Sequence, residues 1–239
     1  KFISSEAPPV EVVEAAYDTA RKNKKAKITE DGVEFQSVID GSTHFFSPEK
    51  SIQIQQNIGA DIIFALDECT SPHGGYDYLK EAMGRTHRWA ERSLEEHRRH
   101  DKFRSLHPVH SSSRDPHDSK FVMPASDQSQ QLFGIVQGGR YRDLREESAR
   151  VISAMDFDGF GIGGSFVKED MHEAVNWVNA ILPKEKPRHL LGVGEPLDLF
   201  GAVENGCDLF DCVAPTRIAR NGTLYTKSGK INILNSKFK

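Results

Sequence analysis

Polar or glycine residues lie at the ends of several apolar runs that are typical of strands. Asp67 ends the run DIIFALD, Gln137 ends LFGIVQ, Gly163 and Gly164 end FDGFGIGG, and Asp211 lies within DLFDCV. A carboxylate accepts hydrogen bonds from ring N–H and amino groups, an amide donates to a carbonyl, and glycines let backbone N–H groups approach a ring edge. If the fold brings them together, these residues suit a planar, hydrogen-bonding ligand such as a nucleobase.

Each of these features also has a plain structural explanation. An aspartate at a strand end is often only a helix cap or a salt-bridge partner. A QGG sequence often only forms a turn, and Gly163-Gly164 could serve packing alone. The functional interpretation therefore rests on the recurrence of such residues at successive strand ends.

Helical patterns separate the apolar runs, which indicates parallel β/α units whose strands are buried on both faces. The expected strands are 61–67, 132–137, 157–164, 189–194 and 208–213, and the helical patterns between them lie around 144–155, 171–181 and 196–203. Such units fit a TIM (β/α)8 barrel or an open doubly wound sheet. No GxGxxG or GxxxxGK[ST] motif follows the end of an expected strand, since GFGIGG (159–164) lies within one, and this weakens the nucleotide-binding alternatives. In a barrel, the strand-end residues would meet at the catalytic end.

The remaining segments are less regular. We expect a helix over residues 9–25, a β-meander over about 27–46, and a helix that Ser47 caps and Gly59 ends. Residues 97–130 are rich in histidine and serine, and their irregular spacing favours a loop-rich insertion over a metal site. We treat 1–239 as one catalytic barrel domain.

Composition and charge narrow the class of protein. The chain has 239 residues, 37% of them hydrophobic and 28% charged, and no apolar run of the ~18 residues that a membrane span needs. The first residues are acidic and lack the apolar core of a signal peptide. Cys69, Cys207 and Cys212 form no CxxC motif, which favours a reduced, cytoplasmic protein with no metal site closed by this chain alone.

Positive charge is concentrated near the end of the sequence. The net charge is −4, yet residues 215–239 contain only basic charged residues: Arg217, Arg220, Lys227, Lys230, Lys237 and Lys239. A local basic strip of this kind is typical of phosphate-binding surfaces. A solvated tail explains it equally well.

Several motifs together resemble one family. They are FALDECT (64–70), FGIVQGG (133–139), GFGIGGSFVKE (159–169), HLLGVGEP (189–196) and LFDCVAPTRIARNG (209–222). This set resembles tRNA-guanine transglycosylase, also called queuine tRNA-ribosyltransferase, of bacterial type. The resemblance covers nearly the whole chain. It implies a TIM barrel with insertions and a pentosyltransferase that exchanges guanine at the anticodon wobble position for a 7-deazaguanine.

The resemblance also implies a role for each motif residue. Asp211 would be the nucleophile that attacks the anomeric carbon of the ribose, because a carboxylate can stabilise and then capture an oxocarbenium-like state. Asp67 would bind the ring N–H and amino edge of the base, while Gln137 and the backbone N–H of Gly164 would hold its exocyclic oxygen. Glu169 would help a peptide to switch between guanine and the queuine precursor. The other base-binding residues that it implies are Cys69, Gly163, Ser165, Val167, Leu191 and Gly192.

The implied partners are nucleic acid and free bases. Arg217 and Arg220 would contact the anticodon loop of a tRNA with a GUN anticodon, whose target base must be flipped out of its stack. The base substrates would be guanine and 7-aminomethyl-7-deazaguanine. The resemblance further implies a homodimer and one structural zinc in the full-length family, with no cofactor held by this chain and no membrane partner.

The chain also departs from the family pattern. Ser165-Phe166 stands where Leu-Ala is usual, which affects the shape of the pocket. The DSGGFQ-type segment and the CxCxxC zinc motif do not occur in these 239 residues. We therefore expect a fragment that is incomplete at both ends and, alone, inactive or weak. Two alternatives are a non-catalytic tRNA-binding partner subunit of the same family and an unrelated barrel glycosidase.

Overall fold

The computed structural model describes residues 26–106, 130–163 and 170–238. Three strands precede the first described helix, α2 (Pro48–Ile58): β1 (Ala26–Ile28), β2 (Val33–Gln36) and β3 (Thr43–Phe46). They form an antiparallel sheet in the order β1-β2-β3, over the residues where the sequence predicts a meander. The predicted helix over 9–25 lies outside the described residues.

Parallel β/α units make up the rest of the fold. A five-stranded sheet runs in the order β4-β5-β6-β7-β8, and every neighbouring pair is parallel. The strands are β4 (Ile62–Phe64), β5 (Gln131–Val136), β6 (Gly159–Ile162), β7 (Arg188–Leu190) and β8 (Leu209–Phe210). The connecting helices are α3 (Tyr76–Leu106), α4 (Arg142–Ser153), α5 (Met171–Asn179) and α6 (Pro196–Glu204).

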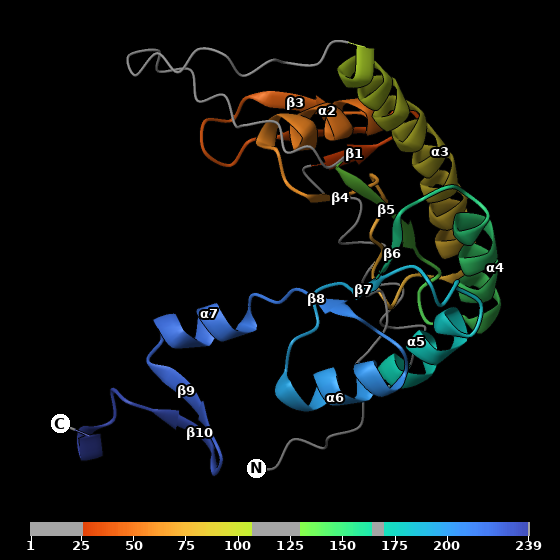
Figure 1. The fold of residues 1–239 in the computed structure, drawn as a ribbon. Coiled ribbons are helices and arrows are strands. Elements are labelled where there is room, and N and C mark those ends of the chain that lie inside the picture. The colour runs from red at the N-terminus through yellow and green to blue at the C-terminus, as the bar shows by residue number, and fades with distance from the viewer. Residues whose placement is uncertain (1–25, 107–129, 164–169, 239) are drawn as a thin grey trace.

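Figure 1 shows that the sheet is curved and that α3, α4, α5 and α6 follow its outer side. This is the arrangement of part of a (β/α) barrel, because each strand is followed by a helix that returns along the outside. The predicted α/β class with parallel β/α units is confirmed. Over the described ranges, no helix has an apolar stretch long enough to cross a membrane.

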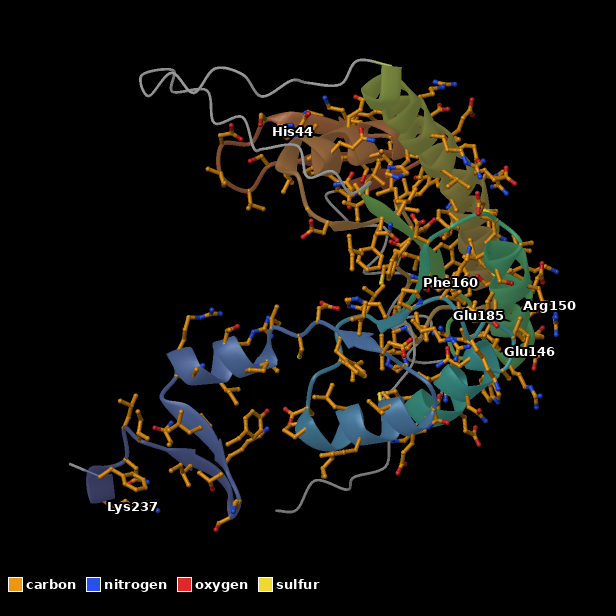
Figure 2. The ribbon with its side chains drawn as sticks, in the orientation of Figure 1. His44, Glu146, Arg150, Phe160, Glu185 and Lys237 are labelled. Carbon is orange, nitrogen blue, oxygen red and sulfur yellow. The ribbon has the colours of Figure 1, made fainter. Side chains whose placement is uncertain are left out.

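The core lies between this sheet and its outer helices. Strand residues such as Leu132, Phe160 and Ile162 are fully buried, as are Ile152 of α4 and Val175 of α5. Phe160 lies on the inner side of α4 in Figure 2, toward the sheet, whereas Glu146 and Arg150 point outward from that helix. Fully burying each large apolar side chain contributes about 1.5–3 kcal/mol, so these contacts fix the curvature of the sheet against its helices.

Aspartates at the amino ends of two strands join neighbouring strands. Asp158, just before β6, accepts a hydrogen bond from the N–H of Leu132 at 2.8 Å. Asp208, just before β8, accepts one from the N–H of Arg188 at 2.9 Å. Because these carboxylates lie at the end of the barrel opposite to the usual catalytic end, we assign them to stability.

A glutamine side chain covers the free side of β4. Gln55 of α2 donates from Nε2 to the carbonyl of Phe64 (2.9 Å) and accepts at Oε1 from the N–H of Phe64 (3.0 Å). An edge strand exposes unpaired backbone groups, and these two bonds satisfy one residue of that edge. Helix α2 begins and ends as predicted, with Ser47 capping the N–H of Lys50 and Gly59 in a left-handed conformation.

Helix α3 is longer than the sequence predicts. We expected a loop-rich insertion from residue 97, but α3 continues to Leu106, so the first part of that segment is helical. Ion pairs along its length, such as Arg92 with Glu49 at 2.7 Å, join the helix to the N-terminal part of the chain. Residues 107–129 lie outside the described part.

The chain after β8 also differs from the prediction. The expected strand 208–213 is only Leu209–Phe210, and a short helix, α7 (Ala214–Arg220), follows. Then β9 (Thr223–Thr226) and β10 (Gly229–Asn232) form an antiparallel hairpin, and a 3-10 turn, η2 (Ser236–Phe238), follows it. An ion pair between Lys230 of β10 and Glu195 at 3.1 Å links the hairpin to the start of α6.

A substitution at Gly159 tests how tightly the sheet is packed. It is the register partner of Phe133, and a Cβ at Gly159 would lie 2.4 Å from the buried Phe133 ring. We expect Gly159→Ala to lower the free energy of unfolding by about 1–3 kcal/mol because the added Cβ would force the buried Phe133 ring or the strand to shift. Chemical denaturation of the full-length protein measures this change in the free energy of unfolding.

Gly84 of α3 provides the matched control. A Cβ there would meet only the flexible end of Arg88, at 3.3 Å. We expect Gly84→Ala to raise stability by about 0.5–1 kcal/mol, since alanine favours a helix interior. Equal effects of the two substitutions would contradict the packing account.

Candidate functional site

The parallel register brings the predicted site residues to one edge of the sheet. Gln137 directly follows β5, Gly163 follows β6, Leu191 follows β7 and Asp211 follows β8, while Asp67 lies three residues beyond β4. In parallel strands, the carboxyl ends face the same way, so these residues share the end of the fold where barrel enzymes place their active sites. The predicted gathering of strand-end residues is therefore present in the structure.

Asp67 and Gln137 are in direct contact. The Gln137 side chain donates from Nε2 to Oδ2 of Asp67 at 2.6 Å, and Gln137 is buried. Burial raises the pKa of the Asp67 carboxyl, and the hydrogen bond from Gln137 opposes this only partly. The pair presents a carboxylate and an amide side by side, which matches the donor and acceptor edge of a nucleobase.

The adjacent carboxylate, Glu68, serves a structural role. It forms a buried ion pair with Arg85 and accepts a hydrogen bond from Tyr78 at 2.5 Å, and both partners lie on α3. Its N–H donates to Thr86 of the same helix at 3.0 Å. Successive residues of an extended segment point to opposite sides, so anchoring Glu68 to α3 turns Asp67 toward Gln137.

Gly163 makes room for the amide of Gln137. A Cβ at Gly163 would lie 2.5 Å from Nε2 of Gln137 and 2.9 Å from the carbonyl oxygen of Val136. Such distances are shorter than van der Waals contact, so any other residue would displace the Gln137 side chain from Asp67. Within the described residues, Gly163 therefore leaves the space that the Gln137 side chain needs to reach Asp67.

Helices α3 and α4 hold the backbone of the QGG segment. The N–H of Gln137 donates to Oγ of Ser148 at 3.1 Å, and Nε2 of His87 lies 3.0 Å from the same oxygen. Burial lowers the pKa of His87 to about 4, helped by the charge of Arg88, so the imidazole is neutral and can accept the Ser148 proton. Nε of the buried Arg145 donates to the carbonyl of Gly139 at 2.6 Å.

Asp211 lies in a different environment from the one we expected. It stands one residue past β8 and its side chain is 57% exposed, so it is not a carboxylate buried in a strand. Its Oδ1 accepts from the N–H of Gly192 at 2.9 Å and lies 3.0 Å from Nε2 of His189. Partial burial would raise the pKa of Asp211, but these two hydrogen bonds outweigh it and lower the pKa below its usual value.

The backbone at Gly192 explains one of these bonds. Its φ is +75°, in the left-handed region that glycine adopts at no steric cost, and a Cβ would meet no atom within 4 Å. The backbone conformation, rather than space, therefore favours glycine. The resemblance implies a base-binding role for Gly192, and the structure adds a contact with Asp211.

The other predicted site residues are placed as follows. Cys69 is exposed and Leu191 is half-buried, both at the same end of the sheet. Gly164, Ser165, Val167 and Glu169 lie outside the described residues. Sequence reasoning does not identify four residues that support the site, because a helical or strand pattern explains each of them equally well. They are His87, Arg145, Ser148 and His189.

Arg217 and Arg220 are exposed in the last turn of α7. Within the described ranges, no carboxylate lies within salt-bridge distance of either guanidinium. Figure 1 shows α7, β9 and β10 extending beyond the end of β8, which carries Asp211 at its carboxyl end. Both guanidinium groups are therefore available to an external anion.

The described residues contain no arrangement typical of a structural zinc site. Among the described residues, no group of three or more His, Cys, Asp or Glu side chains is arranged to hold a metal ion. The described residues therefore do not test the zinc site that the resemblance implies, and that site stays a prediction for the family's full-length form.

The fold and the strand-end residues define a barrel-type α/β protein with a carboxylate-lined site. The model of the family described as queuine tRNA-ribosyltransferase matches residues 9–239. The chain therefore belongs to the queuine tRNA-ribosyltransferase family, as its motifs predict.

Individual relatives agree with this result. A queuine tRNA-ribosyltransferase of Caldanaerobacter subterraneus subsp. tengcongensis is 47% identical over 208 residues, which cover 86% of this chain and 48% of the relative. One from Lactococcus lactis subsp. lactis is 46% identical over 220 residues, covering 91% of this chain and 50% of the relative. One from Symbiobacterium thermophilum is 47% identical over 215 residues. The chain thus spans about half the length of the curated relatives it matches.

The raised pKa of Asp67 predicts a pH effect on stability. The folded protein holds the Asp67 proton more tightly than the unfolded chain does. Stability is therefore lost as the pH rises from the unfolded pKa of about 3.9 through the pKa of the folded state. Asp67→Asn removes this loss. We expect the free energy of unfolding of the variant, relative to wild type, to increase with pH above about 4. Urea denaturation at several pH values measures it, and a difference independent of pH would contradict the assignment.

Proposed function

We propose that the protein containing this chain is a tRNA-guanine transglycosylase, a pentosyltransferase of queuosine biosynthesis. The observation that carries the proposal is Asp211, an exposed and ionised carboxylate held by two hydrogen bonds at the same sheet edge as the Asp67–Gln137 pair. One carboxylate is suited to attack a sugar carbon, and the other lies beside an amide that suits a base. Family membership supports the same activity.

The proposed reaction consists of two displacements at one carbon. An oxygen of Asp211 attacks C1′ of the ribose, the C1′–N9 bond breaks, and guanine leaves with the electron pair and takes up a proton. The incoming 7-deazaguanine then attacks C1′, loses its proton and returns the electron pair to the Asp211 carboxylate. Two inversions retain the configuration, and the RNA backbone is never cut. The family resemblance assigns the proton donor to a DSGGFQ-type segment that these 239 residues lack.

The base would bind at the Asp67–Gln137 pair. Asp67 would accept hydrogen bonds from the ring N–H and amino group, and Gln137 would donate to the exocyclic oxygen, in place of their present mutual bond. Cys69, Leu191 and Gly192, at the same end of the sheet, would contact other parts of the base. Guanine and 7-aminomethyl-7-deazaguanine are the proposed bases. Ser165, Val167 and Glu169 would adjust the preference between them.

The nucleic-acid substrate would approach over α7. Arg217 and Arg220 would contact phosphates or bases of the anticodon loop in a tRNA with a GUN anticodon, since guanidinium groups suit both. The target base would be flipped out of the loop, at lower cost than in a duplex. Because tRNA is an intracellular molecule, we place the reaction in the cytoplasm.

A non-catalytic tRNA-binding subunit is the second candidate function. Family membership supports it as well as the enzyme, whereas it argues against an unrelated barrel glycosidase. The ordered hydrogen bonds on Asp211 favour the enzyme, because a subunit that only binds RNA does not need a held nucleophile. Exchange of labelled guanine into tRNA by the protein as its gene encodes it separates the two.

Substitution of Asp211 tests the nucleophile. We expect Asp211→Asn to reduce guanine exchange by at least about a thousandfold, because an amide oxygen cannot form and release the ribosyl ester as a carboxylate does. The binding of tRNA should stay within about twofold, since phosphate contacts carry most of the affinity. Exchange at the wild-type rate would overturn the nucleophile assignment.

Arg217→Ala and Arg220→Ala test the RNA contact. Each substitution should weaken tRNA binding and reduce the slope of log K against log salt concentration by about 0.7–1. Arg150→Ala is the matched control, because Arg150 points outward from α4 (Figure 2) and pairs with Glu146 at 2.8 Å. Equal losses in the control and in the α7 variants would contradict a specific contact.

A further inference from the structure

His189 contacts the proposed nucleophile, yet the proposed reaction assigns it no role. Its Nε2 lies 3.0 Å from Oδ1 of Asp211. The imidazole is 13% exposed, whereas the Asp211 side chain is 57% exposed. The ring therefore lies on the protein side of the contact and the carboxylate on the solvent side, where a substrate can reach it.

The strand register explains why these two residues meet. His189 of β7 pairs with Leu209 of β8, and Asp211 follows Leu209 by two residues. Residues two apart along a strand direction face the same side of a sheet, so Asp211 emerges on the side that carries His189. The pairing of β7 with β8 thus brings the two side chains to the same side of the sheet.

Aromatic packing fixes the plane of the imidazole. The rings of His189 and Phe64 meet edge to face, with centroids 5.3 Å apart and an interplanar angle of 89°. Phe64 packs in the same way on Phe133, at 5.6 Å. Gln55 also holds the backbone of Phe64 at two atoms. The imidazole is therefore held by a ring contact in addition to its contact with Asp211.

The two contacts to Asp211 converge on one oxygen. Oδ1 accepts from the N–H of Gly192 and lies within hydrogen-bond distance of His189, while Oδ2 receives no hydrogen bond from any other residue in the described part. Two donors on one oxygen restrict rotation about the Cβ–Cγ bond of Asp211. The second oxygen then points in a set direction.

We propose that His189 is a positioning residue that, with the N–H of Gly192, holds Oδ1 of Asp211 so that Oδ2 is presented to the anomeric carbon. This inference rests on the proposed function. In the first step, Oδ2 forms the bond to C1′ as guanine leaves with the bonding pair. In the second step, the incoming base attacks C1′ and the electron pair of the C1′–Oδ2 bond returns to the carboxylate, which the same two donors stabilise as a leaving group.

Two substitutions test the role of His189. His189→Phe keeps the ring contact with Phe64 but removes the donor, and His189→Gln restores an N–H at similar reach. We expect His189→Phe to lower kcat by about 10- to 100-fold with KM for tRNA unchanged, since a small misplacement of a reacting group costs this much. His189→Gln should retain kcat within about threefold. Single-turnover formation of the protein–RNA adduct should slow in parallel with kcat.

Wild-type kcat in His189→Phe would overturn the inference, as would an equal loss in His189→Gln. The Tm of each variant checks folding, and His189→Leu replaces His189→Phe if the latter unfolds. Asp211→Asn, assayed in parallel, separates the two hypotheses. If Asp211→Asn exchanges guanine normally, the proposed nucleophile fails; if only the His189 variants are normal, the positioning role alone fails.

Discussion

In-register parallel pairing of β4 to β8 is the constraint on which the site depends. Each strand is two to six residues long and is followed by a residue that the site uses. A shift in strand register would therefore separate Asp67 from Gln137 and move Asp211 away from His189. The core side chains between sheet and helices hold this register. Asp158 and Asp208 join neighbouring strands at the opposite end.

The two site carboxylates differ in their surroundings, and this difference matches different tasks. Burial raises the pKa of Asp67, whose carboxyl lies against an amide. Hydrogen bonds from Gly192 and His189 lower the pKa of the more exposed Asp211. A half-buried carboxyl beside an amide suits recognition of a base edge, and an ionised, accessible carboxylate suits attack on a sugar carbon. Separating pKa values by environment is a general way to give two carboxyl groups distinct roles.

Local sequence patterns predict the strands of the sheet and the ends of α2, whereas they do not predict the length of α3 or the surroundings of Asp211. Apolar runs bounded by polar residues located the strands of the sheet, and Ser47 and Gly59 marked the ends of α2. The length of α3 is not predicted because the last part of the helix, after Leu94, is rich in charged residues, and ion pairs such as Arg99 with Glu95 lie along it. The contact between His189 and Asp211 depends on the pairing of β7 with β8, which one strand's residues do not encode. The exposure of Asp211 follows from the early end of β8.

The most direct test of the account is to locate the covalent bond between protein and RNA. The protein as its gene encodes it is incubated with tRNA, denatured and digested with protease and ribonuclease, and the ribosylated peptide is identified by mass spectrometry. The account predicts that the added mass lies on the peptide that contains Asp211, at that residue. An adduct on a peptide without Asp211, such as one that carries Asp67, would contradict it.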